Sequence, residues 1–253
     1  MNNKQKYKIL LNISIGSAIL FLVLSFLSMF FYSGGSMINN PKNPLYSESN
    51  LSYSHIYNFF SDLGLYTSWS GYSNSISLVL FSYSLLFVAI ELVAFYYAIH
   101  YILRKDKRLI NISRLGFYVA LISAICFVMV GLFPSDTMFS YHIFAVNLAF
   151  RSFLLVMFIY SYAIFKSSYI SNYLALSYFS LFCLVGYYVY ILLFGPALPA
   201  IPYSDPNFYN QLPSLENLSF HVVSQKFVVY GVIFSTLWQL VELGKQKYID
   251  LID

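Results

Sequence analysis

Six polar side chains in this sequence have the types and positions to form one site. Carboxylates and imidazoles can act as general acids and bases or bind a metal, and a lysine ammonium can meet a phosphate as a point charge. They lie in the outer connections or in the outer part of a long apolar stretch, so we expect them to line one outward-facing cavity: Asp62, Asp136, His142, His221, Gln225 and Lys226. For Ser135 and Asp136, the plainer alternative is that one of them caps a helix.

No known catalytic motif joins these residues. The four histidines are never spaced as H-x-x-x-H or H-E-x-x-H, and neither a G-x-S-x-G elbow nor a glycine-rich phosphate loop is present. The histidines also lie at opposite ends of the apolar stretches, which argues against paired haem ligation. We therefore predict no metal and no cofactor, and whether the protein is an enzyme stays open.

Six long apolar stretches must position these side chains. Charged residues make up only 9% of the chain and the mean hydropathy is +0.66, whereas a soluble domain has about 25% charged residues. A membrane span needs about 20 mostly apolar residues, and the candidates are 9–32, 73–103, 115–133, 139–165, 174–194 and 218–243. The sequence thus predicts an all-α, polytopic membrane protein in which residues 1–253 form a single six-transmembrane-helix domain.

The cations lie almost entirely in alternate connections. The connections on one side hold a single cation, Lys42, and the other side holds Lys4, Lys6, Lys8, Arg104, Lys105, Lys107, Arg108, Arg114, Lys166, Lys245 and Lys247. The positive-inside rule predicts a cell-membrane protein with both termini in the cytoplasm. The net charge of +4 then indicates contact with anionic lipid and no nucleic-acid partner. Sequons at Asn50 and Asn217 would face outside, and their glycosylation stays open.

The first long outer connection, residues 33–72, contains a helical pattern. Between His55 and Gly64 the apolar residues recur with helical spacing: Ile56, Phe59, Phe60 and Leu63. This predicts a short amphipathic helix lying on the bundle or in the membrane interface, with His55, Asn58 and Asp62 on a neighbouring polar face.

The second long outer connection, residues 195–217, contains five prolines and therefore cannot be one regular helix. Its aromatic residues Tyr203, Phe208 and Tyr209 give it apolar surface. We expect it to pack over the outer mouth of the bundle as an ordered cover.

Three charged residues stand out because they lie well inside the predicted spans: Glu91, Arg151 and Lys226. A charge at the bilayer centre costs about 2.5 to 3.5 kcal/mol on insertion scales. Glu91 and Arg151 have similar depths, so we predict that they form an ion pair, and we favour a structural role over a transport pathway. Ser77 and Ser84 precede Glu91 at seven-residue intervals, which places a polar stripe on one helix face.

Short motifs resemble a family of uncharacterised prokaryotic multi-pass membrane proteins, catalogued as a domain of unknown function. The resemblance rests on Ser61-Asp62-Leu63-Gly64 with Asn74, and on Gly131-Leu132-Phe133-Pro134-Ser135-Asp136 with His142 and Phe150. That family looks distantly similar to DRAM-like autophagy modulators and to proteins of GPI-lipid remodelling. Its last helix typically carries an acid, an arginine and a tryptophan, where this chain has Gln225, Lys226 and Trp238. The change from acid to glutamine weakens any acid-base role there.

Three functions are compatible with these features. The first is binding of a membrane lipid or its polar head group in the outer cavity, with Lys226 meeting a phosphate and, in the empty protein, lying within salt-bridge distance of Asp62 or Asp136. The second is a metal-dependent or lipid-processing hydrolase using Asp62, Asp136, His142 and His221. The third is an accessory subunit with a membrane-protein partner, in which the polar cluster would be buried and sealed.

Overall fold

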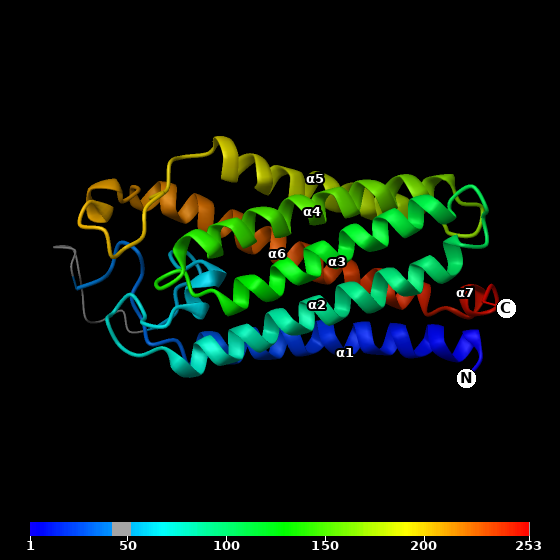
Figure 1. The fold of residues 1–253 in the computed structure, drawn as a ribbon, viewed down its shortest axis with the longest axis horizontal. Helices are drawn as coiled ribbons and strands as arrows, with labels where there is room; N and C mark the ends of the chain where they lie inside the picture. Colours follow the sequence, from blue (N-terminus) through cyan, green and yellow to red (C-terminus); the bar gives the residue numbers. More distant parts are fainter. Residues whose placement is uncertain (42–51, 253) are drawn as a thin grey trace.

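The computed structural model describes residues 1–41 and 52–252, which form an all-helical protein (Figure 1). Six helices are long and apolar enough to cross a membrane. They are α1 (Asn3–Phe30), α2 (Ser75–Leu103), α3 (Ile110–Leu132), α4 (Phe139–Lys166), α5 (Asn172–Phe194) and α6 (Leu215–Leu243). Two short 3-10 helices, η1 (Phe60–Gly64) and η2 (Phe208–Gln211), and a last turn, α7 (Gln246–Ile249), complete the elements. The predicted six-helix membrane bundle is confirmed.

Local sequence signals set several helix ends. A capping box starts α1, because the Asn2 side chain accepts from the Gln5 amide at 2.8 Å and the Gln5 side chain accepts from the Asn2 amide at 3.1 Å. Hydroxyl N-caps start α5 at Ser171 and α6 at Ser214. The six helices follow the predicted spans to within a few residues, except that α1 and α3 begin earlier.

Helices that are neighbours in sequence pack side by side, and α6 closes the ring against α1. At the closing contact the Tyr7 hydroxyl donates to the Leu243 carbonyl at 2.9 Å. Both chain termini lie at one end of the bundle, which we call the terminal end (Figure 1). The opposite end carries residues 31–41, 52–74, 133–138 and 195–214, and we call it the capped end.

Small residues bring α2, α3 and α4 into close contact. A Cβ added to Gly131 would lie 3.1 Å from the Ser82 backbone, and the Ser82 hydroxyl donates to the Gly131 carbonyl at 2.6 Å. Gly116 packs against the ring of Tyr160 in the same way. Such small-residue contacts are typical of membrane helix pairs, where close backbone approach supplies much of the attraction.

The predicted amphipathic helix is shorter than expected and is not a surface helix. Only Phe60–Gly64 is helical, as a 3-10 turn, and Phe60 and Leu63 are buried beneath it. Residues 52–59 instead form turns around the fully buried Asn58. The predicted faces are also wrong in part, because Ile56 is exposed whereas Asn58 and Asp62, placed on the polar face, are buried. Hydrogen bonds of the Asn58 side chain to the surrounding backbone replace helical backbone bonds in this segment.

Candidate functional site

Asn58 is the centre of a buried polar network at the capped end. Its side-chain amide donates to the Gly35 carbonyl at 2.9 Å and to Asp62 Oδ2 at 3.0 Å, and its side-chain oxygen accepts from the Ser54 amide at 2.9 Å. Its own carbonyl accepts from Lys226 Nζ and, at 3.2 Å, from the Tyr53 hydroxyl. Asn58 therefore links two buried charged residues, Asp62 and Lys226, that do not touch each other.

Lys226 lies in this network without forming the predicted salt bridge. It makes no ion pair with any carboxylate of the described residues, so the expected contact with Asp62 or Asp136 is wrong. Its ammonium lies 5.1 Å from the ring centroid of Tyr53 and 5.7 Å from that of Phe60. Ring faces and a backbone carbonyl thus replace a carboxylate as partners of this buried cation.

Asp62 is buried under the same cap. Its carboxylate accepts from the Asn58 amide and from the Phe59 backbone amide, both at 3.0 Å. Burial raises the pKa of Asp62 to about 6, although the Asn58 and Phe59 hydrogen bonds and the charge of Lys226 all act to lower it. Asp62 therefore titrates close to physiological pH.

Gln225 joins the cap to the membrane bundle. Its side-chain oxygen accepts from the Phe60 amide at 2.8 Å, so it satisfies a backbone donor at the start of η1. The matching contact on α2 is made by Ser77, whose hydroxyl donates to the Leu63 carbonyl at 3.0 Å. Helices α2 and α6 thus hold both ends of η1 in place.

Asp136 ties the α3–α4 connection to the first long connection. Its two carboxylate oxygens accept from the backbone amides of Tyr66 at 3.1 Å and Thr67 at 2.8 Å. Ser135 contacts the hydroxyl of Tyr203 at 2.8 Å. Neither residue caps a helix, because α4 begins after Met138 with no side-chain cap. The alternative of a helix N-cap is therefore wrong for both.

The two histidines of the predicted site hold loops. His142 Nδ1 donates to the Phe133 carbonyl at 2.7 Å, and His221 Nε2 donates to the Pro196 carbonyl at 2.7 Å. In each case a buried helix residue fixes the preceding connection. His221 Nδ1 is buried, and no described residue forms a hydrogen bond with it.

Aromatic rings complete the cap, and the proline-rich connection forms part of it as predicted. Trp69 packs against Tyr203 with ring centroids 4.6 Å apart and against Phe208 at 6.0 Å, and Phe208 is fully buried. The six predicted site residues therefore do not line one outward-facing cavity. They bond to backbone groups of neighbouring connections and seal the capped end, because each loop carries backbone donors and acceptors that must be satisfied at the membrane boundary.

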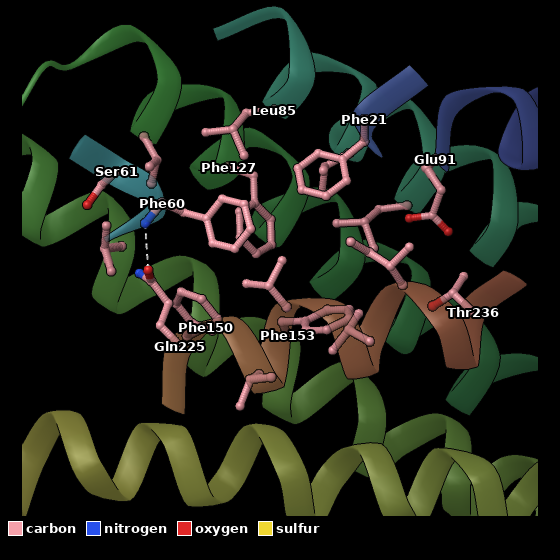
Figure 2. Close-up of a pocket in the computed structure, with 18 of the residues that line it drawn as sticks. Phe21, Phe60, Ser61, Leu85, Glu91, Phe127, Phe150, Phe153, Gln225 and Thr236 are labelled. Atoms are coloured by element: carbon pink, nitrogen blue, oxygen red, sulfur yellow. Dashed lines mark hydrogen bonds between the residues drawn. The ribbon is translucent and has the colours of Figure 1, made fainter. Parts of the chain in front are cut away.

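A cavity of about 120 Å³ lies beneath the cap, in the interior of the bundle (Figure 2). Five of the six spanning helices and η1 line it, and only α5 does not. Its wall is mainly aromatic and aliphatic, and its polar members are Ser61, Gln225, Glu91 and Thr236. Figure 2 shows Ser61 and Gln225 at the end next to the cap and Glu91 and Thr236 at the opposite, deeper end.

Glu91 is the only charged residue in this wall, and it does not pair with Arg151. Its Oε1 is buried and has no hydrogen-bond partner in the part of the chain that the structure describes, whereas Arg151 is exposed on α4. The two residues do not form an ion pair in the described chain, so the predicted pair is wrong. Similar depth was not enough, because the two helices turn these side chains in different directions. The polar stripe of Ser77, Ser84 and Glu91 is confirmed as a buried face of α2.

The remaining sequence features add no site. Among the described residues, no three histidine, cysteine, aspartate or glutamate side chains lie close enough together to hold a metal ion. Asn217 lies in the first turn of α6, where its backbone amide donates to the capping Ser214. The other sequon residue, Asn50, lies outside the described residues, as does Lys42.

Comparisons with known proteins give no relative for this chain. No family model matches it, and no curated protein or solved structure is significantly similar to it. The resemblance to the uncharacterised prokaryotic family and its lipid-remodelling relatives therefore stays a prediction.

Proposed function

We propose that the protein binds a lipidic molecule inside the bundle, with the apolar part in the cavity and a hydroxyl or amine donating to Glu91. The observation that carries this proposal is Oε1 of Glu91, which is buried at the deep end of an apolar cavity with no hydrogen-bond partner among the described residues. Buried polar atoms in native proteins nearly always have partners. An unpartnered one that faces an open volume is well placed to receive a ligand group.

The size and lining of the cavity narrow the ligand class. One water needs roughly 10–15 Å³ of such volume, so about 120 Å³ holds on the order of ten non-hydrogen atoms. This corresponds to a segment of an acyl or isoprenoid chain and not to a whole phospholipid. The polar head group expected at Lys226 has less support, because Asn58 and two aromatic rings already engage that ammonium.

Orientation belongs to the same proposal. The cations of the connections gather at the terminal end, where Lys245 and Lys247 both pair with Glu242 and Arg108 pairs with Asp106. By the positive-inside rule this end faces the cytoplasm of a cell membrane, and the capped end faces outward. The cap would then separate the ligand from the outer solvent.

The two other functions differ in their support. A metal-dependent hydrolase would need Asp62, Asp136, His142 and His221 to converge, and each instead bonds to a different part of the cap. An accessory subunit is favoured by the sealing of the polar cluster, which is the arrangement expected if that cluster has no ligand. The subunit function therefore remains the second candidate.

A cavity-filling variant tests the proposal. Val229 lines the cavity, and Val223 lies on the exposed side of the same helix. We expect Val229→Phe to remove a lipidic molecule that co-purifies with the wild-type protein in mild detergent, and Val223→Phe to retain it. Native mass spectrometry followed by extraction and chromatography measures the bound molecule. Equal retention in both variants would contradict an internal site.

A second measurement tests the role of Glu91. Decanol and undecane have equal numbers of non-hydrogen atoms, but only decanol can donate a hydrogen bond. Decanol should therefore raise the thermal unfolding midpoint more than undecane does, since a buried hydrogen bond contributes about 1 kcal/mol. Glu91→Leu should abolish the difference. Equal shifts of the unfolding midpoint by the two ligands in the wild-type protein would show that Glu91 does not bind the ligand.

A further inference from the structure

Arg151 stands in the middle of an apolar stripe on the outer face of α4. Phe144 and Leu148 precede it on the exposed side, and Leu155 and Phe158 follow it. Its one hydrogen bond among the described residues goes to Asn147 Oδ1, at 3.4 Å. A guanidinium has five N–H donors, so most of its donors have no partner within residues 1–41 and 52–252.

The depth of Arg151 prevents an easy escape to the membrane surface. It lies 12 residues after the start and 15 residues before the end of α4, which is about 18 Å and about 22 Å along the helix. Lysine and arginine side chains reach the interface readily only near helix ends. A fixed charge at this depth is therefore costly unless another group meets it within the membrane.

The spanning helices of this chain do not provide that group. The carboxylates in its six spanning helices are Glu91, Glu216 and Glu242. Glu91 is buried in the bundle, and the other two lie within the first and last turns of α6. A second copy of this chain therefore offers no exposed carboxylate at the depth of Arg151, and two copies meeting through α4 would bring two arginines together.

We propose that the face of α4 centred on Arg151 binds a transmembrane helix of a different protein that carries an aspartate or glutamate at mid-membrane depth. The carboxylate would accept a bidentate pair of hydrogen bonds from the guanidinium, which suits planar acids. Asn147, half-buried one turn away, would face the same partner, and the apolar residues of the stripe would pack against its other side chains. This interface is independent of the ligand cavity, which α4 lines with its opposite side through Val146, Phe150 and Phe153.

The test uses the full-length protein in phosphatidylcholine vesicles with a synthetic polyleucine peptide of about 20 residues. The peptide carries one central aspartate beside a cysteine, and a matched peptide has leucine in place of aspartate. The protein carries Leu148→Cys, with the exposed Cys183 replaced by alanine. Oxidative disulfide cross-linking then reports whether the peptide lies against α4.

We expect the aspartate peptide to cross-link about tenfold more than the leucine peptide, as for an added interaction of about 1.4 kcal/mol. Arg151→Leu should remove this preference and Arg151→Lys should keep part of it. Val223→Cys is the matched control, because it is exposed at a similar depth on α6. Val223→Cys alone should not cross-link. It should do so only when a second change, Phe227→Arg, places a guanidinium on α6.

Three outcomes would overturn the proposal. The first is equal cross-linking of both peptides to Leu148→Cys, which uses the unchanged arginine and so is decisive even if Arg151→Leu fails to fold. The second is a disulfide-linked dimer of the protein without peptide, which would make a second copy the occupant. The third is loss of the aspartate preference when anionic lipid is added, which would assign Arg151 to a lipid phosphate.

Discussion

Asn58 joins more of the capped end than any charged residue does. It is fully buried and bonds to the segment of Gly35, to Ser54 and to Asp62. It also separates the Asp62 carboxylate from the Lys226 ammonium, so the two charges stabilise each other without contact. An uncharged amide suits this position because it can both donate and accept hydrogen bonds. Without it, the Asp62 carboxylate and the Lys226 ammonium would lie among backbone groups that lack hydrogen-bond partners.

The titration of Asp62 makes stability depend on pH. Burial raises its pKa from about 4 in the unfolded chain to about 6 in the folded protein, so the folded state holds the proton more tightly. Stability should therefore be greatest below about pH 4 and fall as pH rises to about 6, by on the order of 3 kcal/mol. Thermal unfolding of the detergent-solubilised protein across this range measures the effect.

Asp62→Asn is the control for this dependence. Asparagine keeps an oxygen that can accept from Asn58 or Phe59, but it does not titrate. The difference in unfolding free energy between the wild-type protein and Asp62→Asn should change between about pH 4 and pH 6 and be flat above that range. A flat difference throughout would show that Asp62 is solvated or paired more strongly than the structure indicates.

At the scale of helices and connections, single side chains hold whole loops in place. Asp136 joins the α3–α4 connection to residues 65–73, and His221 joins α6 to the α5–α6 connection. Loops of the capped end are thus held by polar bonds to backbone, with aromatic packing between Trp69 and Phe208 above the cavity. The ordered conformation of these loops should therefore depend on a few such hydrogen bonds.

Removing the Asp136 carboxylate should loosen residues 65–73 without unfolding the bundle. In Asp136→Ala we expect the amides of Tyr66 and Thr67 to exchange hydrogen about tenfold faster, since each loses a charge-assisted bond of about 1.5 kcal/mol or more. Hydrogen exchange with mass spectrometry measures this. Thr137→Ala, at the neighbouring exposed position, should leave the exchange unchanged, and equal acceleration in both variants would contradict a specific role for Asp136.

Two glycines allow the cost of backbone strain to be measured separately from the cost of close packing. Gly35 and Gly71 both have positive φ angles, of 79° and 88°. A Cβ on Gly71 would meet nothing within 4 Å, whereas one on Gly35 would overlap the Ser70 backbone and lie 2.8 Å from the Trp69 Cβ.

Gly71→Ala should therefore cost only the conformational strain, about 1 to 2 kcal/mol. Gly35→Ala should lower the unfolding midpoint further, because it also displaces the segment that carries Trp69. Thermal unfolding of both variants measures the contrast. Equal losses would show that the contact between Gly35 and Ser70 can relax without penalty.

At the scale of the whole molecule, the charge distribution predicts the orientation in the membrane. We expect a single cysteine at Ser204, at the capped end, to react with an impermeant maleimide in intact cells. One at Asn111, at the terminal end, should react only after permeabilisation. The background lacks Cys126 and Cys183. A third labelling position, Ser47, which the sequence predicts to face outside, lies outside the described residues. Labelling of Asn111 in intact cells would reverse the orientation.

The sequence by itself determined the six helices, most of their ends and the approximate depth of each polar side chain within them. Depth follows from a rise of about 1.5 Å per residue along a helix whose apolar length must match the bilayer. The same helical spacing placed Ser77, Ser84 and Glu91 on one buried face of α2 and placed Asn58 near Asp62. These are properties of a single segment and need no knowledge of its neighbours.

Only the tertiary structure decided which groups of equal depth meet. Glu91 and Arg151 have similar depths, but α2 turns Glu91 into the cavity and α4 turns Arg151 outward. Likewise Asp62, Asp136, His142, His221 and Lys226 gather at one level and bond to loop backbone instead of to one another. The aromatic cavity wall also left no sequence signal, because phenylalanines facing lipid and phenylalanines facing a cavity are equally apolar. Packing against its neighbours sets the rotation of each helix about its axis, and this rotation determines which side chains face one another.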